Sequence, residues 1–141
     1  MGHASLTLLL ADASDSESTA VREGLQSAHV DALLMRTHTA PEALALLRGS
    51  GGRDALHARA VLLLSLALPD AAGCLKALRD EPALARTVVF AVGSSTAAAP
   101  LLRDHAGQVL GCIDPQAPQA GCRQVRELVE HYALISDSAA D

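Results

Sequence analysis

The fold is decided by the stretch Ala60-Val61-Leu62-Leu63-Leu64-Ser65-Leu66-Ala67-Leu68-Pro69-Asp70-Ala71-Ala72-Gly73. Its first part is a run of apolar residues with the length of a fully buried strand, and this strand ends at Ser65. Pro69 and Gly73 then predict a short loop that leads into a helix. The stretch therefore predicts a buried strand whose carboxyl end carries a single hydroxyl side chain.

The alternation of an apolar strand with a helical pattern occurs five times along the chain. Strands are predicted at 6–11, 30–36, 60–65, 87–92 and 108–113. Helices are predicted at 16–27, from the Thr39–Glu42 capping box to 48, at 71–80, at 96–104 and at 119–134. This order predicts an α/β domain with a parallel sheet covered on both faces. The helix at 96–104 is the weakest, because Pro100 lies inside it.

The length of 141 residues fits one domain spanning the whole chain. We expect residues 1–5 to be a leader or a cloning remnant and residues 136–141 to be a flexible tail. The glycine-rich segment 49–53 follows a helix and lacks a Gly-Lys-Ser/Thr ending, so it is interpreted as a plain loop.

The composition excludes several classes of partner. Half of the residues are hydrophobic, with one Phe, one Tyr and no Trp, so the core must consist of Leu, Val and Ala. A net charge of −5 does not favour nucleic acid. No apolar run reaches the ~18 residues of a membrane span, and we expect a cytoplasmic chain. Cys74, Cys112 and Cys122 lack metal-ligand spacing and are predicted to be free, buried thiols, and no cofactor is indicated.

In open parallel sheets of this class, ligands bind beyond the carboxyl ends of the strands. The residues predicted at that edge are Ala11, Asp12, Ser65, Val92 and Asp114. From Leu6 to about Ile135 the chain resembles the receiver domains of response regulators, with Pro69, Gly73 and Pro115 at the spacings of that family. The resemblance implies a flavodoxin-like three-layer sandwich with strand order 2-1-3-4-5.

The resemblance also implies that most functional positions of a receiver are altered. The two acidic residues after the first strand fall on Ala11 and Asp12, the phosphoacceptor aspartate on Ser65, the phosphoryl-binding hydroxyl on Val92, the lysine on Asp114 and the switch aromatic on Gly111. Only the carboxylate of Asp12 remains. No catalytic residue is therefore expected.

Phosphoryl transfer to a receiver needs a carboxylate nucleophile beside Mg²⁺. Ser65 offers an un-ionised hydroxyl with no evident base. Asp114 would repel a phosphoryl group, since two like charges ~4 Å apart cost about 4 kcal/mol at an effective dielectric of 20.

Two further interpretations of this edge stay open. Asp12, Asp114 and Asp15 would form a weak cation site if their side chains converged, whereas the favoured interpretation is that Asp12 and Asp15 cap the first helix. Ser95 or Thr96 is expected to cap the fourth helix.

We interpret the chain as an atypical response regulator, a pseudo-receiver that acts in two-component signalling as a phosphorylation-independent interaction module. Its expected partners are a histidine kinase, another receiver or a second copy in a homodimer. The alternatives are a conventional phosphorelay regulator with an unconventional site, and a small-ligand or redox sensor that uses Cys112 or the pocket at the strand ends.

The resemblance implies an interface formed by the fourth helix, fifth strand and fifth helix. The candidates are Leu101, Leu102, Val109, Leu110, Val125, Leu128, Tyr132 and Ile135. The last helix is also similar to the C-terminal extension of single-domain regulators that partner phytochrome kinases. The alternative, which stays open, is that Tyr132 and Ile135 only complete the core.

Overall fold

The computed structural model describes residues 6–49, 60–85 and 87–140, and side chains as far as His131. The expectations for residues 1–5 and for the loop after Gly49 lie outside the described residues. In the described ranges no helix is long and apolar enough to cross a membrane.

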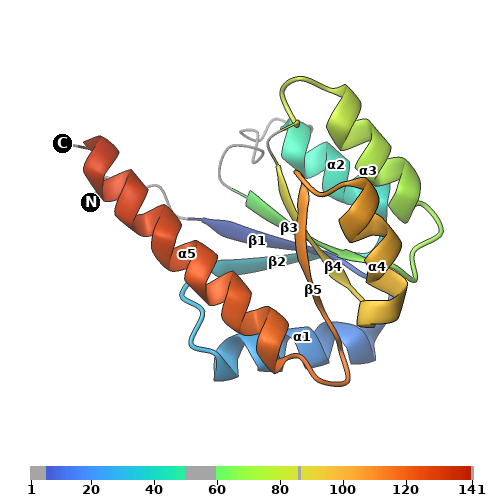
Figure 1. Ribbon diagram of the computed structural model, residues 1–141, viewed down its shortest axis with the longest axis horizontal. Coiled ribbons are helices and arrows are strands. Elements are labelled where there is room, and N and C mark those ends of the chain that lie inside the picture. Colours follow the sequence, from blue (N-terminus) through green and yellow to red (C-terminus); the bar gives the residue numbers. More distant parts are fainter. Residues whose placement is uncertain (1–5, 50–59, 86, 141) are drawn as a thin grey trace.

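Strands and helices alternate as the sequence predicts. The strands are β1 (Thr7–Ala11), β2 (Leu33–Thr37), β3 (Ala60–Ser65), β4 (Val88–Val92) and β5 (Val109–Ile113). The helices are α1 (Asp15–Ser27), α2 (Ala40–Arg48), α3 (Ala71–Asp80), α4 (Ser95–Asp104) and α5 (Gln119–Ala140). The strands form one parallel sheet in the order β2-β1-β3-β4-β5 (Figure 1), so the predicted fold class and strand order are confirmed.

The second strand begins later than predicted. The prediction was 30–36, but the chain is still turning out of α1 there. His29 has a left-handed φ of 59°, and the N–H of Val30 bonds to the carbonyl of Leu25 at 3.0 Å. Pairing with β1 therefore starts only at Leu33.

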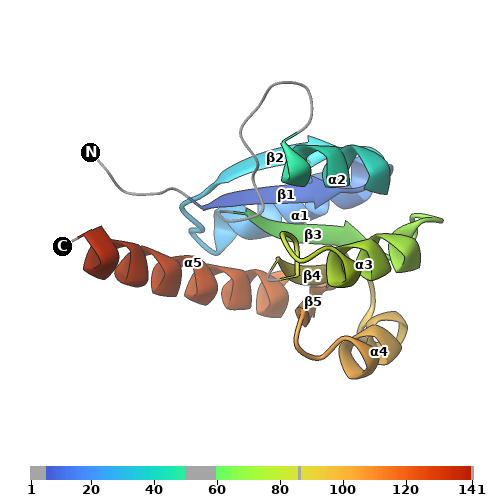
Figure 2. The same ribbon diagram turned by 90° about the horizontal axis from the view of Figure 1, so that it is seen from above.

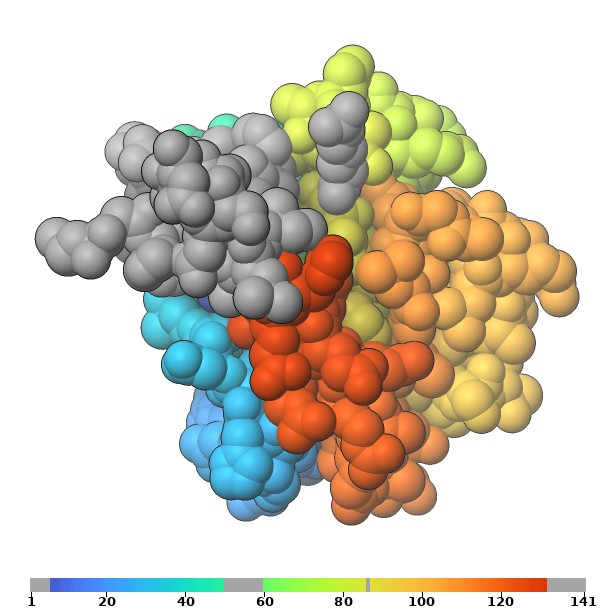
Figure 3. Space-filling view, turned by 60° about the vertical axis from the view of Figure 1, so that its left-hand side comes forward, coloured from blue at the N-terminus to red at the C-terminus, as the bar shows by residue number. Residues whose placement is uncertain are grey.

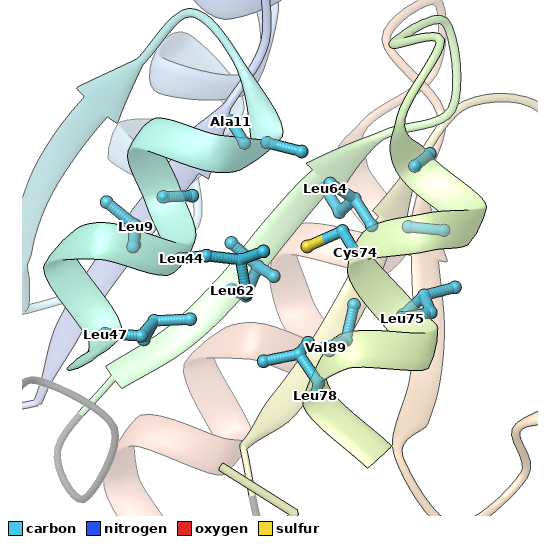
Figure 4. Packing of buried hydrophobic residues seen from close by; sticks show 14 of the residues in the cluster. Leu9, Ala11, Leu44, Leu47, Leu62, Leu64, Cys74, Leu75, Leu78 and Val89 are labelled. Carbon is cyan, nitrogen blue, oxygen red and sulfur yellow. The ribbon is translucent and has the colours of Figure 1, made fainter. Parts of the chain in front are cut away.

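The sheet separates two apolar cores because side chains alternate across a strand. On β1, Leu9 belongs to the core formed with residues of α2, α3 and α4, and Leu8 belongs to the core formed with residues of α1 and α5. Figure 4 shows the first core, where Leu44 of α2 and Cys74 of α3 lie over Leu62 of β3. Each fully buried leucine contributes about 1.5–3 kcal/mol, so aliphatic packing replaces the missing aromatics.

Helix α5 is longer than the sheet that it covers. It has 22 residues, which corresponds to about 33 Å, and it continues past the predicted end at Leu134. Figures 1 and 2 show it running beyond the sheet, past the beginning of β1. In Figure 3 the described part of α5 (red) lies between the segment that follows α1 (blue) and the segment of α4 and β5 (orange).

Candidate functional site at the carboxyl ends of the strands

The carboxyl ends of β1, β3, β4 and β5 meet at one edge of the sheet. Ser65 pairs with Val92 in the β3–β4 register, and Val92 pairs with Ile113 in the β4–β5 register. Asp12 and Asp114 follow directly after β1 and β5. The fold therefore brings the predicted positions together at the edge where ligands bind in this class of sheet.

Ser65 is completely buried, and its hydroxyl has two partners. It donates to Oε1 of Glu17 at 3.2 Å and accepts from the N–H of Ala67 at 3.2 Å. The expectation that no base lies near this hydroxyl was wrong, because α1 brings a carboxyl group to it. The single proton of the hydroxyl is committed to that carboxyl group.

Asp12 is 1% exposed and ties down the start of α1. Its Oδ1 accepts from the N–H of Ser14 at 2.9 Å, and its backbone carbonyl accepts from Nε and Nη2 of Arg36 at 3.2 and 3.0 Å. Arg36 also forms an ion pair with Asp15 at 2.9 Å. The guanidinium therefore binds the Asp12 carbonyl and Asp15, and Oδ2 of Asp12 is buried without a hydrogen-bond partner among the described residues.

Glu17 was missed by the sequence analysis. Burial raises the pKa of its carboxyl group, and the close approach and negative charge of the Asp12 carboxylate raise it further, while the hydrogen bond from the Ser65 hydroxyl lowers it in part. With Asp114, Glu17 lines a cleft of about 590 Å³ at this edge. The only signal in the sequence was an acidic residue in the first turn of a helix. Such a residue usually interacts with the positive end of the helix dipole.

The altered positions after β4 and β5 have simple structural roles. Val92 is buried, and Asp114 is half-buried with Oδ1 accepting from the N–H of Gln116 at 2.9 Å. At Gly111 an added Cβ would lie 2.7 Å from Oε1 of Gln124 and 3.1 Å from Cε2 of Phe90. The space next to Gly111 is thus occupied by the end of the Gln124 side chain from α5 and by the Phe90 ring from β4.

Two of the predicted helix caps were assigned to the wrong residues. Ser14 caps α1 by accepting from the N–H of Glu17 at 3.2 Å, while Asp12 bonds to Ser14 and Asp15 pairs with Arg36. Ser94 caps α4 by accepting from the N–H of Ala97 at 3.1 Å. The cap of α4 precedes the two residues expected for it, whereas the cap of α1 lies between Asp12 and Asp15. Each helix begins one residue earlier than predicted.

The acidic residues of this edge do not form a three-ligand metal cluster. In residues 6–49, 60–85 and 87–140 no group of three His, Cys, Asp or Glu side chains is placed to hold a metal ion. Asp12, Asp15 and Asp114 therefore do not converge as the cation interpretation requires.

The interface candidates differ in exposure. Val109 and Val125 are 2% and 0% exposed core residues, so their assignment to an interface was wrong. Leu110 is 48% exposed on the edge strand β5. Leu101, Leu102 and Leu128 are partly buried. The side chains of Tyr132 and Ile135 lie outside the described residues.

The cysteines are free in the described structure. Cys74 and Cys122 are buried, and burial raises the pKa of each thiol to about 11. Cys112 is half-buried, and its pKa is raised by burial and then by the charge of Asp114. Raised thiol pKa values reduce the thiolate fraction on which cysteine reactivity depends.

The folded chain has the architecture of response-regulator receiver domains. No protein-family model and no curated protein sequence matches it. Among solved structures, a response regulator in red light signaling of R. palustris superposes with a TM-score of 0.67 at 20% identity, over 87% of this chain and 90% of that one.

Two further receiver structures give the same result. A two-component response regulator from Legionella pneumophila has a TM-score of 0.71 at 17% identity, over 89% of this chain and 98% of that one. A phosphorylated cyanobacterial phytochrome response regulator has a TM-score of 0.66 at 21% identity, over 93% and 95%. At these identities the likeness establishes the fold.

Proposed function

We propose that this chain is a pseudo-receiver, a cytoplasmic two-component signalling module that binds protein partners without being phosphorylated and without catalysis of its own. The observation that supports this most is the state of Ser65. At the position where the receiver family has its acceptor aspartate, this chain has a buried hydroxyl held between Glu17 and the N–H of Ala67.

The charge of the edge also supports the proposal. A phosphoryl group carries negative charge and is stabilised by cations. Here the cleft lining includes Glu17 and Asp114 and no Lys or Arg among the described residues. An incoming phosphoryl group would meet carboxylates in the described lining of this cleft, and the nearby Arg36 is already paired with Asp15.

The proposed partners are a histidine kinase, another receiver or a second copy of the chain. The surface in question lies along α4 and β5, where Leu110 is 48% exposed and Leu101 and Leu102 are partly buried. An exposed edge strand with an apolar side chain favours protein contact. The net charge of −5 does not favour nucleic acid as a partner.

A redox sensor based on Cys112 has less support. Burial and the neighbouring charge of Asp114 raise the pKa of this thiol, which keeps it protonated and slows its oxidation.

Acetyl phosphate and beryllofluoride test the proposal. The native chain, incubated with acetyl phosphate and Mg²⁺, is expected to keep its mass in intact-protein mass spectrometry, and beryllofluoride with Mg²⁺ is expected to leave its melting temperature unchanged. A conventional receiver treated in parallel shows that the reagents are active. A hydroxylamine-sensitive adduct on the native chain would contradict the proposal.

A pair of variants separates the nucleophile from the charge of the cleft. Ser65→Asp alone restores a carboxylate, whereas Ser65→Asp with Asp114→Lys also supplies a cation. Because Asp114 repels anions, we expect beryllofluoride to stabilise the double variant more than the single one. An equal response of the two variants would show that Asp114 does not oppose phosphoryl binding.

A further inference from the structure

A nearly continuous series of hydrogen bonds connects three segments at the carboxyl edge. The N–H of Ala67 donates to Ser65, and the hydroxyl of Ser65 donates to Oε1 of Glu17. On the other side, the N–H of Ser14 donates to Oδ1 of Asp12. The contact between Glu17 and Asp12 lies in the middle, and two ionised carboxylates have no hydrogen to share there.

Asp12 contributes the one buried oxygen in this series that lacks a donor among the described residues. Its Oδ2 is buried without a partner among the described residues, and the side chain as a whole is 1% exposed. Glu17 lies within hydrogen-bonding reach of Asp12. A buried carboxylate oxygen without a donor is costly, and one proton on the neighbouring carboxyl group supplies that donor.

We propose that Asp12 and Glu17 form a proton-binding site, in which one proton taken up below neutral pH joins the two carboxyl groups and completes a hydrogen-bonded chain from Ala67 to Ser14. With the proton on Glu17, its O–H donates to Asp12 and its Oε1 still accepts from Ser65. Each buried polar atom named in this series of hydrogen bonds then has a partner. The shared proton connects the loop after β3, helix α1 and the loop after β1 through hydrogen bonds.

The surrounding charges favour uptake of this proton. Asp12 faces Glu17 from the end of β1, Ser65 faces it from β3, and Asp114 lies on the same cleft after β5. On its own helix the carboxylate of Asp15 is paired with Arg36 from β2. The burial of Glu17 and the charge of Asp12 raise its pKa above the ordinary value of 4.5.

The sign of the pH effect follows from linkage. The folded chain holds the proton more tightly than the unfolded chain, in which the carboxyl group has its ordinary pKa. This stabilisation is therefore complete below 4.5 and is lost as the pH rises through the raised pKa of Glu17. Glu42, Asp80 and Glu81 act in the opposite direction, since their lowered pKa values cost stability in acid.

The direct test is a carboxyl ¹³C NMR titration of the full chain labelled at glutamate, with the Glu17 signal assigned by its loss in Glu17→Gln. The expected midpoint lies above 4.5, and in Asp12→Asn it moves downward, because the amide donates to Glu17 and carries no charge. A midpoint at or below 4.5 in the native chain, or no downward movement in Asp12→Asn, would overturn the proposal.

A second readout follows unfolding by urea at a series of pH values from 4.5 upward, because the pKa of Glu17 is raised above 4.5. Glu17→Gln supplies a permanent N–H donor to Asp12, so its stability relative to the native chain is expected to increase with pH. Glu23→Gln removes the same charge from an exposed position on α1 and is expected to follow the native curve. Parallel curves for Glu17→Gln and Glu23→Gln would count against the shared proton.

These outcomes are independent of the phosphorylation tests. The proton site stands on the contacts of Asp12, Glu17 and Ser65, and it would survive a finding that another residue accepts a phosphoryl group. Conversely, an ordinary titration of Glu17 would leave the pseudo-receiver proposal in place.

Discussion

Gly121 lies where helix α5 meets the sheet backbone. A Cβ at this position would lie 2.8 Å from Cα of Ile113 and would overlap the carbonyl oxygen of Cys112. These backbone atoms belong to the packed sheet and cannot move aside, whereas the end of a flexible side chain could. The glycine is required by this close approach and not by an unusual φ.

Gly121→Ala is therefore expected to destabilise the chain by about 1–3 kcal/mol, because α5 must move off β5. The matched control is Gly73→Ala on α3, where an added Cβ meets nothing within 4 Å. That control is expected to stabilise by about 0.5–1 kcal/mol, since alanine favours the helix. Urea unfolding of both variants measures the difference, and equal effects would contradict the packing argument.

At the scale of single residues the sequence predicted positions better than contacts. It placed Ser65, Asp12 and Asp114 at one edge, because the ends of parallel strands meet there whatever their side chains are. It missed Glu17, since no local pattern distinguishes a carboxylate that turns inward from one that serves the helix dipole. Contacts of that kind depend on the packing of α1 and become visible only in the folded chain.

At the scale of elements, α4 is the helix held least firmly. Ala98 is its one buried residue, and Pro100 lies exposed in its interior. Proline removes the N–H that would bond to the carbonyl of Thr96 and disturbs the turn before it. The sequence predicted both the existence and the weakness of this helix, because proline acts through local geometry.

Pro100→Ala is expected to stabilise the chain by about 1–3 kcal/mol and to slow amide hydrogen exchange along α4. The control Ala99→Gly changes a neighbouring exposed residue and is expected to destabilise by about 1 kcal/mol. Faster exchange in Pro100→Ala would show that the proline is needed for the geometry of the helix.

The other elements show where local signals suffice. The Thr39–Glu42 capping box is formed as predicted, with both reciprocal bonds present. The start of β2 was predicted too early. The apolar residues after α1 have the composition of a strand, but the backbone there still hydrogen-bonds to the last turn of the helix. The strand order came from the resemblance to receivers, since the alternation of elements does not fix which strands are neighbours.

At the scale of the whole molecule, the two edges of the sheet each expose one large apolar side chain. Leu33 is 63% exposed on β2 and Leu110 is 48% exposed on β5, at opposite ends of the strand order. The two edges differ in surroundings, because β5 packs beside α4, whose Leu101 and Leu102 are partly buried. We therefore expect self-association through the α4–β5 edge.

Light scattering at tens of micromolar is expected to report a homodimer for the native chain and a monomer for Leu110→Glu. The charge lies in water in the monomer but would be buried without a partner in the dimer, which costs several kcal/mol. Leu33→Glu makes the same change at the other edge and is expected to stay dimeric. A native monomer contradicts the prediction, and dissociation by Leu33→Glu alone would place the contact at β2. Both side chains are largely exposed, so each variant is expected to change the free energy of unfolding of the monomer by no more than about 0.5 kcal/mol. Loss of the dimer therefore reports on association and not on folding.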